Sequence, residues 1–155
     1  MNLIKKRILI TAGEPASISS EITIKAIKKL KKESNSELIL ITDPSLIKQE
    51  IKNLNKSDEL NILDKKLNFK DYKNDFINII PIKLNEKTIP GILNKKNSDF
   101  VLKSIKMSVD FLLQKKANAV VTNPINKFIM KSKNFKFNGH TEYLGHLSKL
   151  NKNPV

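Results

Sequence analysis

Near the start of the chain lies the stretch that decides the fold, Arg7-Ile8-Leu9-Ile10-Thr11-Ala12-Gly13-Glu14-Pro15. The apolar, β-branched run at its beginning predicts a buried strand, and the glycine and proline that follow end that strand. A helical pattern comes next, with lysines on one face and apolar side chains on the other, namely Ile22, Ala26, Ile27 and Leu30. The sequence therefore begins with a strand, a turn and a helix, as α/β proteins do.

The same alternation continues along the chain. We expect further strands at residues 37–42, 60–63, 78–82 and 119–122, with helices after Asp43-Pro44, from about Ser98 to Lys116, and after Gly139. Pro81 predicts that its strand lies near a sheet edge, because proline cannot donate a backbone hydrogen bond. Since the connections are too long for hairpins, the prediction is an α/β fold with a largely parallel sheet covered by helices on both faces.

Composition limits the class of protein. With 155 residues, 39% of them hydrophobic, the chain can form one domain with a real core. No apolar run reaches the roughly 18 residues that a membrane span requires, and the first residues carry no secretion signal. We therefore expect a cytoplasmic protein with no membrane partner. The absence of cysteine excludes disulfides, thiolate catalysis and cysteine-ligated metals.

The net charge of +14 raises the question of nucleic-acid binding. Arg7 is the only arginine among the 29 basic residues, whereas specific recognition of bases and phosphates favours arginine. The lysines are also spread over the whole length instead of forming one basic patch. We therefore expect no specific nucleic-acid partner, only weak and non-specific binding.

Ligands of parallel sheets bind beyond the carboxyl ends of the strands. Two loops of this sequence follow strands in this way and are candidate ligand-binding sites. The first, Gly13 to Ser20, precedes a helix whose free N–H groups suit an anion, but it has only one of the three glycines of a dinucleotide fingerprint. Its residues alone favour a structural turn. In the second loop, residues 122–127, polar side chains follow a buried strand, and ligand binding and turn formation explain them equally well. The candidates for lining a cleft are Gly13, Glu14, Asn126 and Lys127.

The most informative stretch is Gly139-His140-Thr141-Glu142-Tyr143-Leu144. Gly139 permits an unusual backbone angle or a close ligand approach, and His140 opens a helix, whose dipole favours a neutral imidazole. Such a ring can exchange a hydrogen bond with a substrate hydroxyl or carboxylate. Thr141 also has a simpler explanation as the helix cap. His146 lies about 240° around the helix from His140, so the two cannot bind one metal, and we assign no metal ligand or catalytic residue within the chain.

Taken together and in this order, the three segments resemble motifs of the 4-hydroxythreonine-4-phosphate dehydrogenase (PdxA) family. Residues 13–21 are similar to its Gly-Asp/Glu-Pro-Ala-Gly-Ile-Gly-Pro-Glu motif, residues 122–127 to Thr-Ala-Pro-Ile-Asn-Lys, and residues 139–144 to Gly-His-Thr-Glu-Tyr/Phe-Leu. The chain departs from the family at Ser17, Ser19 and Ser20, which stand in place of glycine, glycine and proline. It departs again at Asn123, which stands in place of alanine.

The resemblance implies an isocitrate/isopropylmalate dehydrogenase-like fold that binds NAD without the glycine fingerprint. It implies oxidation of 4-phosphohydroxy-L-threonine at its secondary alcohol, with hydride transfer to NAD and then decarboxylation, in the synthesis of pyridoxal 5'-phosphate (vitamin B6). A divalent metal (zinc, magnesium or cobalt) would polarise the hydroxyl. His140 and Thr141 would contact this small phosphorylated hydroxy amino acid, and the complete enzyme would be a homodimer.

The resemblance makes residues 1–155 the amino-terminal part of a longer family pattern. The family's metal-binding histidines, its phosphate-binding lysine and arginine, and most NAD contacts lie downstream of the Gly-His-Thr motif. We therefore expect an incomplete fold whose carboxyl-terminal part is absent and which is inactive alone. Two alternatives stay open: a dehydrogenase of a related four-carbon acid such as erythronate or threonate 4-phosphate, and a non-catalytic α/β remnant.

Overall fold

The computed structural model describes residues 5–33, 35–64, 66, 69–131 and 135–149. Its helices and strands confirm the predicted alternation: β1 (Lys6–Thr11), α1 (Ser19–Glu33), β2 (Ser36–Thr42), α2 (Pro44–Asn53), β3 (Leu60–Ile62), β4 (Ile77–Pro81), α3 (Ser98–Leu113), β5 (Ala119–Val121), α4 (Lys127–Lys131) and α5 (His140–Leu147). Two short 3-10 helices, η1 (Phe69–Asp71) and η2 (Lys95–Asn97), lie in the connections. None of the helices in the described ranges is long and apolar enough to cross a membrane.

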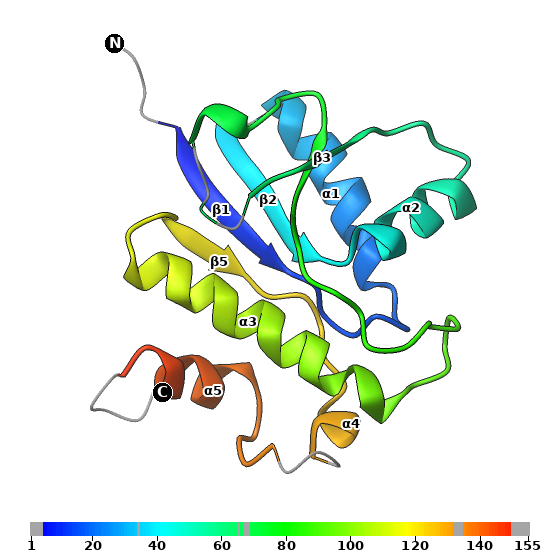
Figure 1. The fold of residues 1–155 in the computed structure, drawn as a ribbon, viewed down its shortest axis with the longest axis vertical. Helices are drawn as coiled ribbons and strands as arrows, with labels where there is room; N and C mark the ends of the chain where they lie inside the picture. The colour runs from blue at the N-terminus through cyan, green and yellow to red at the C-terminus, as the bar shows by residue number, and fades with distance from the viewer. Residues whose placement is uncertain (1–4, 34, 65, 67–68, 132–134, 150–155) are drawn as a thin grey trace.

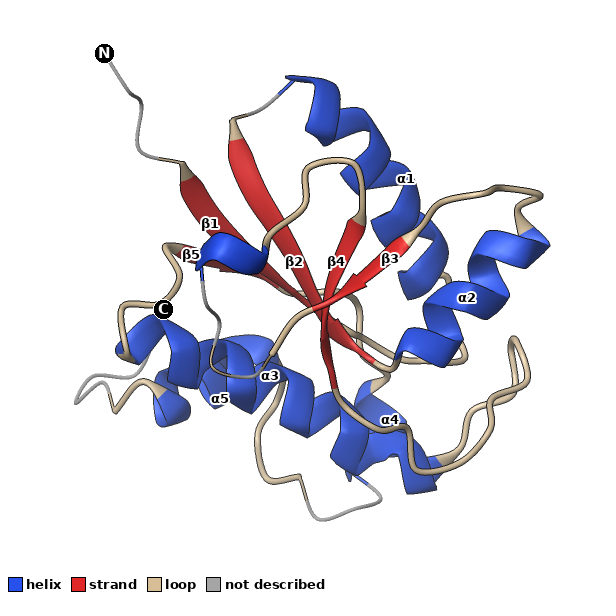
Figure 2. Ribbon diagram, turned by 45° about the horizontal axis from the view of Figure 1, so that its top comes forward, coloured by secondary structure: helices blue, strands red, loops and turns tan. Residues whose placement is uncertain are grey.

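The described strands form one parallel sheet in the order β3-β4-β2-β1-β5 (Figure 1). Helices cover both faces, with α1 and α2 on one side and α3 on the other (Figure 2). One apolar cluster packs α1 and α2 against the sheet through Ile10, Ile24, Ile27, Leu38, Leu40, Ile47, Ile51, Ile77 and Ile79. The other includes Leu9, Ile39, Ile41, Ile80, Phe100, Val101 and Ile105. The predicted parallel α/β architecture is therefore confirmed.

Two expectations about the fold are wrong. The strand that contains Pro81 is not at an edge, since β4 lies between β3 and β2. Pro81 is tolerated because it is the last residue of β4, opposite Thr42, where the ladder ends. In α1 the sheet contact is made by Ile24 and Ile27, whereas Ile22 and Leu30 are 37% and 40% exposed. Apolar residues occur on more than one side of this helix, so helical periodicity alone does not identify its buried face.

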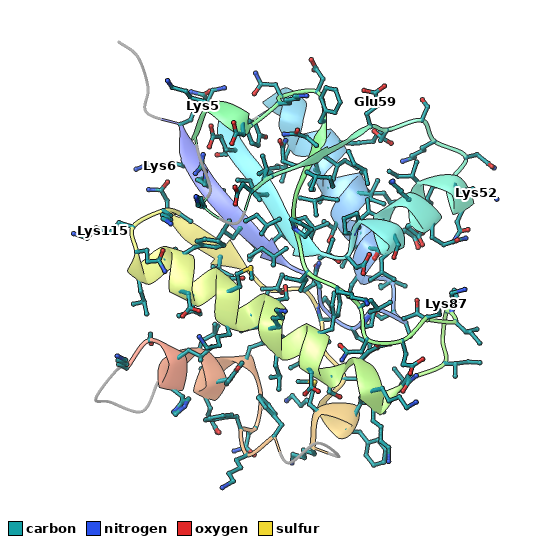
Figure 3. The ribbon with its side chains drawn as sticks, viewed as in Figure 1. Lys5, Lys6, Lys52, Glu59, Lys87 and Lys115 are labelled. Atoms are coloured by element: carbon teal, nitrogen blue, oxygen red, sulfur yellow. The ribbon has the colours of Figure 1, made fainter. Side chains whose placement is uncertain are left out.

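The single arginine has a structural position between β1 and β2. Arg7 is 1% exposed, and its Nε donates to Glu37 Oε2 at 2.9 Å while Nη2 lies 2.7 Å from the same oxygen. Burial of a charge is tolerated when an opposite charge and hydrogen bonds accompany it. None of the lysines whose burial the structure describes is buried, and those labelled in Figure 3 lie on opposite sides of the molecule.

Candidate functional site

The first loop is shaped by Gly13, which follows β1. Its φ of +71° lies in the left-handed region, and an added Cβ would be 2.5 Å from Ser19 Oγ, 2.6 Å from Asn123 Cβ and 2.8 Å from Pro124 O. Only glycine fits this backbone angle and this spacing. The loop after β1 is therefore pressed directly against the loop after β5, as expected for parallel strands whose carboxyl ends share one edge.

Glu14 holds the two loops together from inside. Its N–H donates to Pro124 O at 2.8 Å, and its carboxylate Oε1 accepts from Ala16 N at 3.2 Å. Burial raises the pKa of the Glu14 carboxyl, against the opposing effect of the Ala16 N–H. Gly13 and Glu14 are both buried, so they support the loop from within rather than present atoms to solvent. Their cleft-lining role remains a prediction.

The serines that depart from the family motif fill the entry to α1. Ser17 Oγ donates to Glu14 O at 2.7 Å and shares a 2.8 Å hydrogen bond with Ser19 Oγ. Ser19 is buried, and its Oγ lies 3.5 Å from Pro124 O. The hydroxyl groups of Ser17 and Ser19 thus bond to the carbonyl oxygens of Glu14 and Pro124, at two positions where the family motif has glycine.

Asn123 is a connecting residue in the loop for which the sequence left ligand binding and turn formation equally open. Its N–H donates to Thr11 Oγ1 at 3.0 Å, and its Nδ2 donates to Thr11 O at 2.8 Å and to Thr23 Oγ1 at 2.7 Å. The side chain therefore ties the ends of β1 and β5 to the first turns of α1. The only signal in the sequence was that an amide stands where the family motif has alanine.

The second loop leads into α4 through Asn126 and Lys127. The side chain of Asn126 is half-buried, and its Oδ1 accepts from Ile129 N at 3.1 Å. Lys127 is exposed and begins α4. Its side chain lies beside Gly139, since a Cβ added to Gly139 would be 3.4 Å from Lys127 Cε and 3.7 Å from Nζ. The second loop is thus adjacent to the start of α5.

His140 is the first residue of α5 and lies partly buried beside this lysine. Burial lowers the pKa of its imidazole, and the positive charge of Lys127 lowers it further. Within the described residues its Nε2 is buried and has no hydrogen-bond partner. Burial and the charge of Lys127 therefore favour a neutral imidazole, in addition to the helix dipole considered from the sequence. A neutral ring with an unused nitrogen can donate to, or accept from, a ligand.

Two expectations about this segment need correction. Gly139 has an extended backbone with φ 168°, which any residue adopts, so the unusual backbone angle is not observed. Thr141 does not cap α5, because the cap position is Gly139 and no side-chain hydrogen bond is made there. Thr141 is exposed and lines an apolar hollow beside α3 and β5. Its contact with substrate stays a prediction.

The structure thus brings the three motif segments into one series of contacts. The first loop contacts the second through Glu14 and Pro124, and the second contacts the third through Lys127 and Gly139. His146 is exposed, and its ring lies 5.0 Å from that of Phe137. In the described ranges, no group of three or more histidine, aspartate or glutamate side chains could hold a metal ion.

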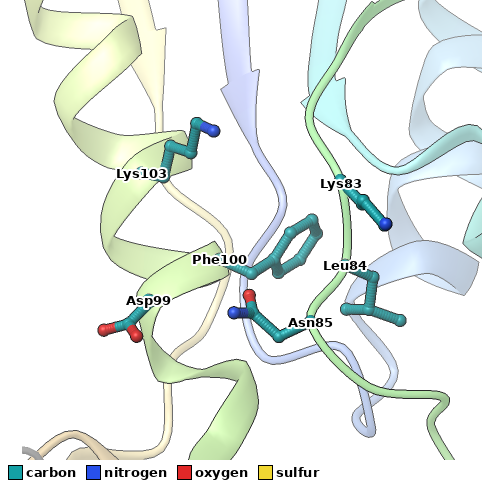
Figure 4. A pocket seen from close by; sticks show the side chains of 6 residues that line it. All are labelled: Lys83, Leu84, Asn85, Asp99, Phe100 and Lys103. Atoms are coloured by element: carbon teal, nitrogen blue, oxygen red, sulfur yellow. The ribbon is translucent and has the colours of Figure 1, made fainter.

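A hollow that sequence reasoning missed opens at the carboxyl end of β4. It has a volume of about 430 Å³ and lies between the segment after β4 and the first turns of α3 (Figure 4). Its lining residues are Lys83, Leu84, Asn85, Asp99, Phe100 and Lys103. Both signs of charge are present, so the lining is polar without being a selective anion site.

Comparison with known proteins identifies relatives of this chain. Residues 33–155 match the family model of the pyridoxal phosphate biosynthetic protein PdxA. The 4-hydroxythreonine-4-phosphate dehydrogenase of Wigglesworthia glossinidia brevipalpis is 37% identical over 149 residues, which are 96% of this chain and 44% of that protein. The one from Shewanella frigidimarina is 32% identical over 89% of this chain and 41% of its own length.

Solved structures of similar proteins share the fold of this chain. The 4-hydroxythreonine-4-phosphate dehydrogenase from Burkholderia phymatum superposes with a TM-score of 0.86 at 23% identity, over 97% of this chain and 46% of that one. The Klebsiella pneumoniae enzyme gives a TM-score of 0.80 at 25% identity, over 94% and 45%. The fold is the isocitrate/isopropylmalate dehydrogenase-like α/β fold, as expected. The chain spans somewhat less than half the length of these relatives.

Proposed function

Because the chain belongs to the PdxA family of pyridoxal phosphate biosynthetic proteins, we propose that it is the amino-terminal part of a 4-hydroxythreonine-4-phosphate dehydrogenase acting in vitamin B6 synthesis. The relatives that carry this name align with 88% to 96% of the chain. The observation that carries the proposal is the placement of Lys127 and His140 side by side at the carboxyl edge of the sheet.

The substrate on this proposal is 4-phosphohydroxy-L-threonine. Its secondary alcohol loses a proton to a base and a hydride to NAD, and the resulting β-keto acid loses carbon dioxide. His140 offers the buried Nε2 for a hydrogen bond with the substrate, and Thr141 offers a hydroxyl group. Lys127 supplies a positive charge beside that imidazole, which suits an anionic substrate. These residues bind and orient the substrate.

The cofactors of this proposal are NAD and a divalent metal, zinc, magnesium or cobalt. When bound, NAD would accept the hydride, and the metal would supply a Lewis acid for the hydroxyl group. The described residues contain no group of side chains that could hold a metal ion. We therefore propose that the metal ligands belong to the part of the family pattern that this chain does not match. The complete enzyme is proposed to be a homodimer.

The test is an assay of NADH formation. The purified chain, supplied with 4-phosphohydroxy-L-threonine, NAD and each of the three metals, is expected to form no NADH. Co-expression with the carboxyl-terminal part of the Wigglesworthia glossinidia relative, the portion that this chain does not match, is expected to give activity. Steady NADH formation by the chain alone would contradict its proposed inactivity.

Two comparisons make this assay specific. In the co-expressed protein, His140→Ala should abolish activity, whereas His146→Ala, at an exposed position of the same helix, should leave it within a factor of two. Erythronate 4-phosphate and threonate 4-phosphate serve as competing substrates. A higher kcat/KM for either of them would replace the proposed substrate while keeping the enzyme class.

A further inference from the structure

The first turn of α5, which carries His140, gets little support from its own backbone. The helix has 8 residues, fewer than the roughly 12–15 that an isolated helix needs to be stable in water. Its first backbone hydrogen bond, from Tyr143 N to Gly139 O, is 3.3 Å long, just beyond the usual range. Gly139 itself has no side chain that could anchor the chain. The position of His140 therefore depends on contacts made by neighbouring side chains.

Asn138 and Glu142 make such a contact across this turn. Glu142 Oε2 accepts a hydrogen bond from Asn138 N at 3.0 Å, and Glu142 Oε1 accepts one from Asn138 Nδ2 at 2.7 Å. We call these two hydrogen bonds the Asn138–Glu142 clamp. The cap position between the two residues, Gly139, receives no side-chain hydrogen bond. The clamp therefore spans Gly139 and His140 and ties the chain before the helix to its first turn.

The carboxyl group of Glu142 suits this role because it stays ionised near neutral pH. The backbone N–H and the side-chain amide of Asn138 lower its pKa, and the positive charge of Lys131 lowers it further. Hydrogen bonds to a charged carboxylate are about twice as strong as those between neutral groups. Two such bonds also fix the orientation of Asn138, since both its backbone and its side chain are held.

Aromatic contacts hold the two ends of the same segment. The ring of Tyr143 lies 5.2 Å from the rings of Phe135 and Phe137, and Phe135 is buried. These contacts keep Phe137 and Tyr143 near each other. They do not set the backbone of the residues between the two rings, where Gly139 allows many conformations. The clamp constrains this inner part of the segment.

The inner part of the segment carries the contact with Lys127. A Cβ added to Gly139 would be 3.4 Å from Lys127 Cε and 3.7 Å from Nζ, so the lysine side chain lies against the glycine backbone. The next residue, His140, keeps its Nε2 buried and, within the described residues, without a hydrogen-bond partner. A change in the backbone at Gly139 would therefore separate Lys127 from the imidazole and expose that nitrogen atom to solvent.

We propose that Glu142 is a positioning residue, which holds the His140 imidazole at the substrate through the Asn138–Glu142 clamp. The clamp fixes Gly139 against Lys127, and the imidazole follows Gly139 directly in the chain. This inference rests on the proposed function, which makes His140 a substrate contact. Glu142 itself does not touch the substrate on this proposal, because Asn138 occupies both of its carboxylate oxygens.

A direct effect of the Glu142 charge on His140 would have the opposite sign. A carboxylate near an imidazole favours the protonated ring, so removing that charge alone would lower the pKa of His140. Opening the clamp lets water reach the ring and lets Lys127 move away from it, and both changes raise the pKa toward 6.5. The direction of the change therefore separates positioning from a simple charge effect.

The test is an NMR titration of the His140 ring protons in the full chain. Glu142→Ala should raise the pKa of His140 by roughly half or more of the rise that Lys127→Met causes. Glu142→Gln keeps an acceptor for Asn138 N and should not raise the pKa of His140. Glu86→Ala, which removes another exposed carboxylate with a lysine partner, is the matched control and should leave that pKa unchanged.

A second variant opens the clamp from its other side. Asn138→Ala removes only the 2.7 Å hydrogen bond from Nδ2 and should raise the pKa of His140 by a smaller amount than Glu142→Ala does. Circular dichroism checks the folding of each variant. If Glu142→Ala is less folded than the wild type, the titration of Asn138→Ala decides.

The consequence for the substrate is measured in the co-expressed protein. Glu142→Ala should raise the KM for 4-phosphohydroxy-L-threonine about tenfold, and Glu142→Gln should stay within about threefold of the wild type. Three results would overturn the proposal: a pKa of His140 that does not rise in Glu142→Ala, equal rises in Glu142→Ala and Glu142→Gln, or a raised pKa with an unchanged KM. A co-expressed wild type that forms no NADH would refute the proposed function, and the NMR titration would still decide whether the clamp holds His140.

Discussion

The side chain of Lys127 lies against Gly139, within 3.4 Å at Cε and 3.7 Å at Nζ of the position that a Cβ of Gly139 would take. The loop after β5 therefore delivers a positive charge to the residue that precedes His140. That charge, together with burial, lowers the pKa of the imidazole. A cation and a neutral hydrogen-bonding ring side by side form a pair that suits an anionic ligand with a hydroxyl group.

Removing this charge should raise the pKa of His140. In Lys127→Met, burial still lowers the pKa but the repulsion by the ammonium group is gone, so the value moves back toward 6.5. The shift can be followed by NMR titration of the His140 ring protons. Lys131→Met, at the exposed last residue of α4, is the control and should leave the titration of His140 unchanged. Equal shifts in both variants would show that no specific pairing exists.

The same lowered pKa makes stability depend on pH. His140 is neutral more readily in the folded than in the unfolded state, so between the two pKa values the unfolded chain binds more protons. Its contribution to stability is present above the unfolded pKa of about 6.5 and is lost as pH falls through the folded value. The difference in unfolding free energy between the wild type and His140→Asn should therefore change across this window. If this difference changes by no more than about RT between pH 8 and pH 5, the pKa of His140 is not lowered in the folded state.

Gly13→Ala should be strongly destabilising. The new Cβ combines an unfavourable φ of +71° with overlaps against Ser19, Asn123 and Pro124, and we expect a loss of about 2–4 kcal/mol in denaturant unfolding. Gly91→Ala is the matched control, because Gly91 has a similar φ of +78° but nothing within 4 Å of its added Cβ. It should cost only about 1 kcal/mol. Similar losses in the two variants would mean that packing between the loops contributes little.

Asn123→Ala restores the alanine that the family motif has at this position. In this chain it removes two hydrogen bonds of the buried side-chain amide, to Thr11 O and to Thr23 Oγ1, so we expect a loss of about 1–3 kcal/mol. Asn53→Ala, which affects an exposed amide at the end of α2, should stay within about 0.5 kcal/mol. Chemical denaturation of the wild type, Asn123→Ala and Asn53→Ala measures these losses. An unchanged midpoint for Asn123→Ala would show that the hydrogen bonds of Asn123 do not stabilise the fold.

Glu37→Ala should be more costly than the loss of an exposed ion pair. It leaves the buried guanidinium of Arg7 without this carboxylate, for which we expect about 3–5 kcal/mol. Glu86→Ala removes the exposed pair with Lys96 and should cost about 1 kcal/mol or less. Urea unfolding curves measure both. If the two losses are equal, burial of the Arg7–Glu37 pair does not contribute to the stability of the β1–β2 contact.

The local pattern of the sequence predicted most of the regular structure. Buried strands such as β2 and the long helix α3 are marked by consecutive or periodic apolar residues, and their positions agree with the structure to within a few residues. The strand-helix alternation also predicted a parallel sheet. His140 was correctly placed at the start of a helix because Gly139 interrupts the pattern just before it.

Features that depend on distant residues could not be predicted in this way. The hydrogen bonds of Asn123 reach Thr11 and Thr23, which are 112 and 100 positions away in sequence, so no short pattern contains them. The strand order put β4 inside the sheet although it contains Pro81, and Thr141 turned out to face an apolar groove instead of capping its helix.

By itself the sequence determined which segments become strands and helices and which three motifs carry the family resemblance. Only the tertiary structure decided that Lys127 lies beside Gly139 and His140, that Gly13 and Glu14 are buried between loops, and that β5 is an edge of the described sheet. The physical reason is one of range. Periodicity and turn preference act over a few consecutive residues, whereas burial, pKa and edge position depend on which distant segments the chain topology brings together.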